Sequence, residues 1–228
     1  MTDRQTVRVK SNNAFTLAEV LITLGIIGVI AAITITLLIN IYNIPKVRTE
    51  LQKAYSDLSQ AYIAILADNN GTFKGICSTD ACVKQLFIDK MKIIKECTSA
   101  NSNGICIGAS QTYLNPSLGS VSNSLDSFIT ANGVSISIWG TDINCSSLRA
   151  VINGTNSSCG IIQVDINGLR TPNKIGEDIY IFHILANKIL PVGGNYSYSG
   201  YQYCDSNSNS LTAGNGCAFT VLNGGWHN

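Results

Sequence analysis

The chain has 228 residues, of which 45% are hydrophobic, so it is long and apolar enough for one ordinary domain plus a terminal segment. Disorder throughout the chain is excluded by this composition. The 15 basic and 14 acidic residues leave a net charge of +1, which excludes a broad positive surface that would hold a polyanion. Nothing in the composition argues for a nucleic-acid partner.

A long apolar stretch follows a short basic segment at the N-terminus. Between residues 15 and 41 the only charged residue is Glu19. About 20 helical residues cross the hydrocarbon core of a bilayer, and this stretch is longer than the apolar core of a cleaved secretory signal. Arg4, Arg8 and Lys10 precede it. Because positive flanks stay in the cytoplasm, we expect a single span with everything C-terminal to it exported.

The residues at the start of this stretch resemble a known signature. The sequence AFTLAEVLITLGIIGVIAAI, residues 14–33, resembles the N-terminal signature of type IV prepilins and type II secretion pseudopilins. The resemblance implies that residues 1–14 form a leader, which a prepilin peptidase removes on the cytoplasmic side of the inner membrane. Cleavage would fall between Ala14 and Phe15, and the same enzyme would methylate the new amine of Phe15.

Two positions depart from the usual pattern of this family. The residue before the cut is Ala14, where the family usually has glycine. Residues 33–36 contain no proline, whereas many pilus-forming members carry one in this part of the helix. The missing proline favours a pseudopilin or a minor subunit, but a type II secretion pseudopilus and a type IV pilus both stay open.

Glu19 is the residue of the apolar stretch that needs a physical explanation, because a charge inside a membrane needs a partner. Under the resemblance, cleavage creates a positive amine at Phe15. When subunits stack with a small axial stagger, Glu19 of one subunit reaches the amine of its neighbour. We therefore expect Glu19 to set the register of assembly between pilin-like subunits, without any catalytic role.

Beyond the apolar stretch, the pattern predicts that the same helix continues to residue 68. Val47, Leu51, Leu58 and Ile65 mark an amphipathic stripe over residues 42–68. The Asn-Asn-Gly that follows predicts the end of the helix.

Residues 69–228 are expected to form an exported globular head. A second helix is predicted within residues 78–97, because Cys82, Leu86 and Cys97 recur at roughly helical spacing. The polar residues 98–132 are expected to be mostly irregular. A half-buried antiparallel strand is predicted at residues 133–140, and further strands at residues 159–168, 177–185 and 217–226. The expected fold class is α+β: a long N-terminal helix, half membrane-spanning and half amphipathic, packed on a small antiparallel sheet.

All eight cysteines lie in the expected head, which favours a disulfide framework in an oxidising compartment. Zinc is the weaker interpretation, because the tight paired spacings of zinc sites are missing and only His183 and His227 could add ligands. Local pairs such as Cys77 with Cys82, Cys204 with Cys217, or Cys97 with Cys106 are possible, and the full connectivity stays open. The candidates are Cys77, Cys82, Cys97, Cys106, Cys145, Cys159, Cys204 and Cys217.

A weak metal-site hypothesis arises in residues 164–182. Asp165, Asn167, Glu177 and Asp178 supply oxygen ligands that suit calcium, but their spacing is not that of an EF-hand. An Asn-Gly hairpin with solvated acids is the simpler interpretation. No cofactor is therefore assigned, with calcium kept as a hypothesis.

Catalysis is not expected, because neither histidine has an evident nucleophile partner and no common catalytic motif occurs. An alternative function is a membrane-anchored, exported binding module, such as an adhesin or a head that holds carbohydrate or DNA. Its contact residues would be Tyr196, Tyr198, Tyr201 and Tyr203, which could stack on sugars or bases.

Overall fold

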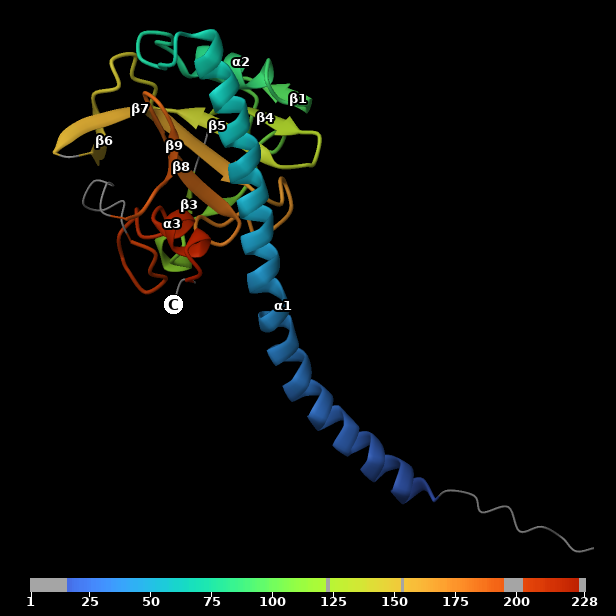
Figure 1. Cartoon of the computed structure of the whole chain (residues 1–228). Coiled ribbons are helices and arrows are strands. Elements are labelled where there is room, and N and C mark those ends of the chain that lie inside the picture. The colour runs from blue at the N-terminus through green and yellow to red at the C-terminus, as the bar shows by residue number, and fades with distance from the viewer. Residues whose placement is uncertain (1–15, 122–123, 153, 195–202, 226–228) are drawn as a thin grey trace, which may run out of the picture. The chain divides into compact units, whose positions relative to one another are not determined.

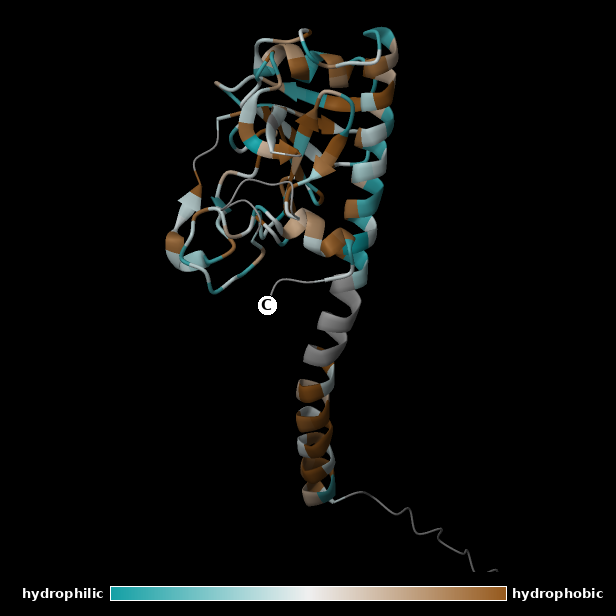
Figure 2. Ribbon diagram, turned by 60° about the vertical axis from the view of Figure 1, so that its left-hand side comes forward, coloured by the Kyte–Doolittle hydropathy of each residue, from teal (hydrophilic) through white to brown (hydrophobic). Residues whose placement is uncertain are grey.

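The computed structural model describes residues 16–121, 124–152, 154–194 and 203–225. The chain divides into two compact units, Met1–Asn43 and Ile44–Asn228. The first helix, α1, covers Leu17–Asp68 and passes through Pro45 (Figure 1). The described residues of its first part are mostly apolar, whereas polar and apolar residues alternate in its second part (Figure 2). The expected long helix with two different halves is therefore present.

The end of α1 is fixed by the polar residues that follow it. Gly71 adopts a left-handed φ of 78°, and its N–H donates to the carbonyl oxygen of Leu66 at 2.8 Å. The side-chain amide of Asn69 donates to the carbonyl oxygen of Ile65 at 2.7 Å. These bonds satisfy carbonyl groups that the last helical turn leaves open. The Asn-Asn-Gly sequence thus ends the helix as its residue types predict.

The head, within Ile44–Asn228, is built on an antiparallel sheet. In the part of the chain that the structure describes, seven strands form one sheet in the order β1-β4-β5-β7-β8-β9, and β6 pairs with β7 beside this path. A separate two-stranded sheet joins β2 to β3. The strands are β1 (Ile93–Cys97), β2 (Gln111–Thr112), β3 (Ser120–Val121), β4 (Asp126–Thr130), β5 (Ser135–Trp139), β6 (Ser147–Ile152), β7 (Thr155–Asp165), β8 (Ile179–Leu185) and β9 (Ile189–Pro191). The short helices are α2 (Asp80–Ile88), the 3₁₀ helix η1 (Pro116–Leu118) and α3 (Cys217–Leu222).

The main core lies between the second half of α1 and one face of the sheet. Leu51, Leu58 and Ile65 on α1 are fully buried against apolar residues of β4, β5, β7 and β8. The Tyr55 ring stacks on Phe182 of β8 with centroids 5.3 Å apart. Such aromatic pairs add to the burial of apolar area. The amphipathic stripe of α1 is therefore the surface that holds the helix on the head.

Tyr62 of α1 is among the largest fully buried side chains of this core. Its ring lies between Phe73 and Phe87, with centroid distances of 5.4 Å and 6.2 Å. Its hydroxyl donates to the carbonyl oxygen of Leu185 at the end of β8. A buried phenol needs such a partner, so this bond fixes α1 against the end of one strand.

The opposite face of the sheet is also covered at β5, which corrects the expectation of a half-buried strand at residues 133–140. Ser135 and Ser137 of β5 are 2% and 1% exposed. The Ser135 hydroxyl donates to the carbonyl oxygen of Cys106. Gln163 of β7 donates to the side chain of Gln111 at 3.1 Å. The serines alternate with apolar residues as predicted, but the segment that contains Cys106 and Gln111 contacts this face and accepts the Ser135 hydroxyl.

The predicted second helix is partly wrong. The helix α2 ends at Ile88, and β1 occupies Ile93–Cys97, which the pattern had assigned to the same helix. The physical reason is long-range pairing, because β1 forms an antiparallel ladder with β4. This ladder also means that residues 98–132 are less irregular than expected, since β4 lies within them. Tertiary pairing overrides local periodicity here.

The predicted strand over residues 217–226 is wrong. The described part of this range contains the short helix α3, Cys217–Leu222, in which Cys217, Ala218 and Val221 are buried. The buried positions recur at helical spacing, and Gly224 with its φ of 93° ends the segment. The strands β6 and β9 were not expected from the sequence.

All eight cysteines lie in described residues and form four disulfides, so none is free. Three join residues that are close in sequence, namely Cys77 to Cys82, Cys97 to Cys106, and Cys204 to Cys217. The fourth joins Cys145 to Cys159 at the base of the β6–β7 hairpin. The disulfides therefore fix loops and hairpin ends at the margins of the sheet.

We expect Gly193→Ala to destabilise the head by about 2 to 4 kcal/mol, because it combines backbone strain with steric overlap. Gly193 has a φ of 118°, and an added Cβ would lie 2.6 Å from both Gly216 O and Phe219 Cβ. Gly133→Ala is the matched control, since Gly133 has a φ of 85° but open space around an added Cβ. Urea unfolding of both variants separates strain from overlap. Equal losses of stability would show that overlap at Gly193 contributes nothing.

Candidate processing and assembly site

The start of α1 holds the Glu19 carboxylate in a defined position. The backbone N–H of Thr16 donates to Oε2 of Glu19 at 2.9 Å, and the Thr16 hydroxyl donates to the same oxygen at 2.8 Å. The N–H of Glu19 donates to the Thr16 hydroxyl oxygen at 3.3 Å. This reciprocal arrangement is a capping box, in which two side chains satisfy open N–H groups at a helix start. The carboxylate therefore contacts the backbone N–H of Thr16, the residue that follows position 15 in the sequence.

The two residues of the expected cleavage site cannot be placed against this geometry. Ala14 and Phe15 lie outside the described residues. What the structure does place is Thr16, the second residue after the expected cut, in direct contact with Glu19.

The helix that follows Glu19 is suited to a membrane. Among the described residues, one helical segment is long and apolar enough to span a bilayer: Leu17–Ile35, with 19 residues and a hydropathy of 2.4. No part of it is buried inside the protein. Large apolar side chains exposed in this way need a lipid or protein environment. The prepilin-type helix therefore fits a membrane anchor.

The hydroxyl groups within this segment are satisfied by the helix itself. Thr23 donates to the carbonyl oxygen of Glu19 at 3.0 Å, and Thr34 donates to that of Ile30 at 2.9 Å. Such back-bonding removes the cost of an unpaired hydroxyl in hydrocarbon. Glu19 is consequently the one charged group that the span has to accommodate.

The head contains a second polar cluster, made of the expected calcium ligands. Asp178 accepts the backbone N–H of Lys174 at 2.6 Å and that of Asn173 at 2.8 Å, and the side-chain amide of Asn167 at 2.9 Å. Asp165 accepts the N–H of Asn167 at 3.2 Å. With its amide oriented to match its neighbours, Asn173 donates to the other oxygen of Asp165 at 3.1 Å. The carboxylates close the loop between β7 and β8.

This arrangement does not fit a calcium ion. The oxygens of Asp165 and Asp178 already accept N–H groups of their own loop, so they are not free ligands. Among the described residues, no group of three or more His, Cys, Asp or Glu side chains is arranged to hold a metal. Glu177 instead pairs with Lys174 at 2.6 Å. The interpretation as solvated acids also needs correction, because Asp165 and Asp178 are 2% and 4% exposed.

Burial changes the protonation of this cluster. It raises the pKa of Asp165 to about 8, and the nearby charge of Asp178 acts in the same direction. The pKa of Asp178 is also raised by burial, against the hydrogen bonds from Lys174 and Asn173 that lower it. Asp165 is thus held as a neutral acid at pH 7, which reduces repulsion between the two carboxyl groups.

Two of the remaining candidates from the sequence, His183 and Tyr203, lie among the described residues. His183 of β8 is fully buried, and burial together with the charge of Arg149 lowers its pKa to about 4. Its imidazole is therefore neutral and shielded from solvent. Tyr203 is 54% exposed. Tyr196, Tyr198, Tyr201 and His227 lie outside the described residues.

Two features of these sites were not predicted, although a sequence pattern indicates one of them. The capping box is visible as Thr16-x-x-Glu19, the S/T-x-x-E pattern that precedes an apolar run. No sequence pattern indicates that Asn173 donates hydrogen bonds to both Asp165 and Asp178. These bonds depend on the left-handed φ of 50° at Asn173.

Comparison with known proteins supports the N-terminal site alone. A family model described as the prokaryotic N-terminal methylation motif matches residues 9–35, which include Ala14, Phe15 and Glu19. The chain therefore carries the prepilin-type signature, and this motif supports a precursor of the type IV pilin or pseudopilin kind. No curated protein and no solved structure matches the chain.

Proposed function

We propose that this chain is the precursor of a structural, pilin-like subunit that polymerises through its apolar helix. The observation that carries the proposal is the position of Glu19 in the first turn of a wholly exposed apolar helix, inside the methylation motif. A prepilin peptidase removes residues 1–14 and methylates the amine of Phe15. The subunit then stays in the inner membrane through residues 15–41, with its head exported.

The polymerisation step uses the charge that cleavage creates. The new amine of Phe15 is positive, and Glu19 of a staggered neighbour neutralises it in an apolar environment. The disulfides of the head support export, because they form in an oxidising compartment. The product is a type II secretion pseudopilus or a type IV pilus-like filament. The missing proline at residues 33–36 supports a pseudopilin or minor subunit.

Mass spectrometry of the protein from native membranes tests the processing step directly. We expect the mature chain to begin at Phe15 and to carry one methyl group on its amine. A chain that begins at Met1, or that is cut near Ala31, would overturn the proposal. An uncleaved chain would leave the Glu19 carboxylate without its amine partner, and the membrane-anchored binding module would then be the better account.

A further inference from the structure

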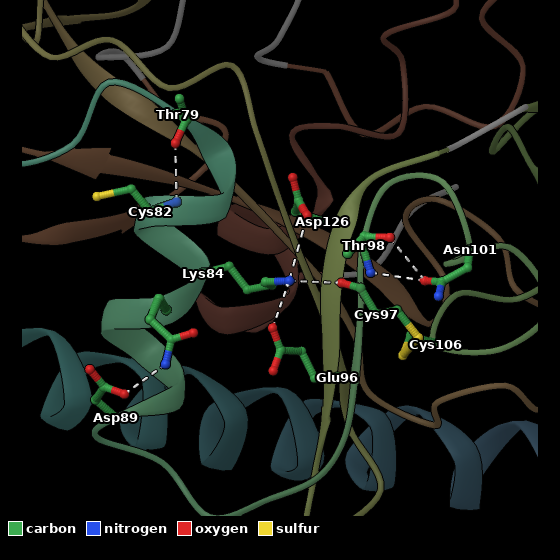
Figure 3. A network of polar contacts seen from close by, with 11 residues as sticks. Thr79, Cys82, Lys84, Asp89, Glu96, Cys97, Thr98, Asn101, Cys106 and Asp126 are labelled. Carbon is green, nitrogen blue, oxygen red and sulfur yellow. Dashed lines mark hydrogen bonds and ion pairs between the residues drawn. A yellow bond between two sulfur atoms is a disulfide. The ribbon is translucent and has the colours of Figure 1, made fainter.

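A buried amine in the head is surrounded by two carboxylates. Lys84 lies on α2 and is 3% exposed. Its Nζ lies 2.9 Å from Oε1 of Glu96, 2.9 Å from the carbonyl oxygen of Cys97, and 3.5 Å from Oδ1 of Asp126. Figure 3 shows the three oxygens converging on the amine, from β1 and β4. The head thus brings a nucleophile and a carboxyl group within reach of each other.

Three oxygens lie within 3.5 Å of Nζ, one for each N–H group of the lysine ammonium. Condensation of Lys84 with a carboxyl group requires one proton to leave the amine. The two short contacts, to Glu96 and Cys97, can keep the two N–H groups that remain. The lone pair then faces Asp126, and the proton can pass to that carboxyl group, which gives an amine and a carboxylic acid.

The two carboxylates differ in exposure, which separates their roles. The side chain of Asp126 is 16% exposed, whereas that of Glu96 is 46% exposed. A shielded carboxyl group keeps water away from the reacting atoms, while an exposed one can exchange protons with the solvent. Asp126 therefore suits the part of electrophile and Glu96 that of proton carrier.

We propose that Lys84 and Asp126 condense to form an intramolecular amide bond, with Glu96 as the acid–base residue. The Nζ lone pair attacks Cγ of the protonated Asp126, so that the C–N bond forms. Glu96 takes a proton from the nitrogen and returns it to the hydroxyl group, which leaves as water when the Cγ–O bond breaks. Glu96 ends in its starting form, and no oxidant or reductant is needed.

The amide would add a link that the disulfides do not provide. Cys82 of α2 pairs with Cys77, just before the helix, and Cys97 of β1 pairs with Cys106 in the next loop. Neither of these bonds, nor the other two disulfides, joins α2 to the sheet. A Lys84–Asp126 amide ties α2 directly to β4, and it persists when the disulfides are reduced.

Peptide mapping of the full chain, reduced, alkylated and digested with trypsin, tests this proposal. We expect the peptide that contains Lys84 to be joined to the one that contains Asp126, with the mass of one water missing and no cleavage after Lys84. A succinimide at Asp126 also loses water, but it leaves Lys84 cleavable and would overturn the proposal. Glu96 and Asp126 lie on the same tryptic peptide, so fragmentation of the joined peptides has to locate the link. Unlinked peptides at full mass, or a link located at Glu96, would also overturn the proposal.

Three variants test the assigned roles, with intact disulfides as the check that each variant folds. Lys84→Arg and Asp126→Ala should remove the link completely. Glu96→Gln keeps the shape but removes the proton carrier, so link formation should slow by about 100-fold or more. A link that persists in Lys84→Arg, or forms at the normal rate in Glu96→Gln, contradicts the mechanism. None of these measurements depends on filament assembly.

Discussion

The Glu19→Ala chain should be inserted in the membrane and cleaved after Ala14, yet it should fail to assemble into filaments. Without the carboxylate, the amine of Phe15 in each neighbour is left charged and unpaired in an apolar environment. Removing one partner of a buried ion pair costs about 3 to 5 kcal/mol, which corresponds to a loss of roughly 100-fold to several thousand-fold in association. The fraction of the protein that sediments as filament, against the fraction left in membranes, measures this loss.

Thr16→Val is the matched control for Glu19→Ala, because Glu19 also serves as half of a capping box with Thr16. The valine variant loses the hydroxyl cap, at a cost of about 1 kcal/mol to the helix, but it keeps the charge on Glu19. Filaments should therefore persist in Thr16→Val. Normal assembly of Glu19→Ala would refute the register role, whereas equal failure of both variants would assign it to the helix cap.

Much of the long helix and its two halves could be predicted from the sequence, because both are local patterns. The apolar stretch after Glu19, the amphipathic stripe through Leu51 and Leu58, and the Asn-Asn-Gly end each act within a few residues. The prepilin-type signature is local as well, and it was recognised from residues 14–33 alone. Periodicity and capping chemistry are sufficient for such elements.

The head was predicted less well, because its strands depend on partners far along the chain. Residues 93–97 continue a helical spacing, yet they pair with β4, about thirty residues later. The serines of β5 alternate as a solvent-facing row would, yet the loop that contains Cys106 buries them. No sequence pattern indicates which groups surround Lys84, because its oxygen neighbours come from two strands, β1 and β4.

Asp165→Asn should make the head more stable than the natural chain at alkaline pH. The pKa of Asp165 is about 8 in the folded head, against an ordinary value of 3.8. Between these values the folded state binds a proton that the unfolded state has released, so the stability contributed by this group falls as pH rises. It is fully present below about pH 4 and is lost as pH passes 8. Asparagine has no proton to release, so the variant escapes this loss.

The structure provides room for the asparagine side chain. Its oxygen can accept the N–H of Asn167, as Oδ1 of Asp165 does, and its amide can face that of Asn173 with donor and acceptor exchanged. The two chains should therefore be similarly stable near pH 4. At pH 9 the variant should be more stable, with an upper bound of roughly 5 to 6 kcal/mol at about 1.4 kcal/mol for each pKa unit.

Asp142→Asn is the contrasting control, because it acts on stability with the opposite sign. Slight burial raises the pKa of Asp142, but the N–H groups of Ser146 and Asn144 outweigh it and lower the pKa overall. The stability that Asp142 contributes is present above its ordinary pKa and is lost on acidification. Its asparagine variant should gain nothing at alkaline pH.

Urea unfolding of the full chain in detergent, from pH 4 to pH 9, compares the natural chain with Asp165→Asn and Asp142→Asn. Parallel loss of stability in Asp165→Asn and the natural chain would show that Asp165 is already ionised in the folded head.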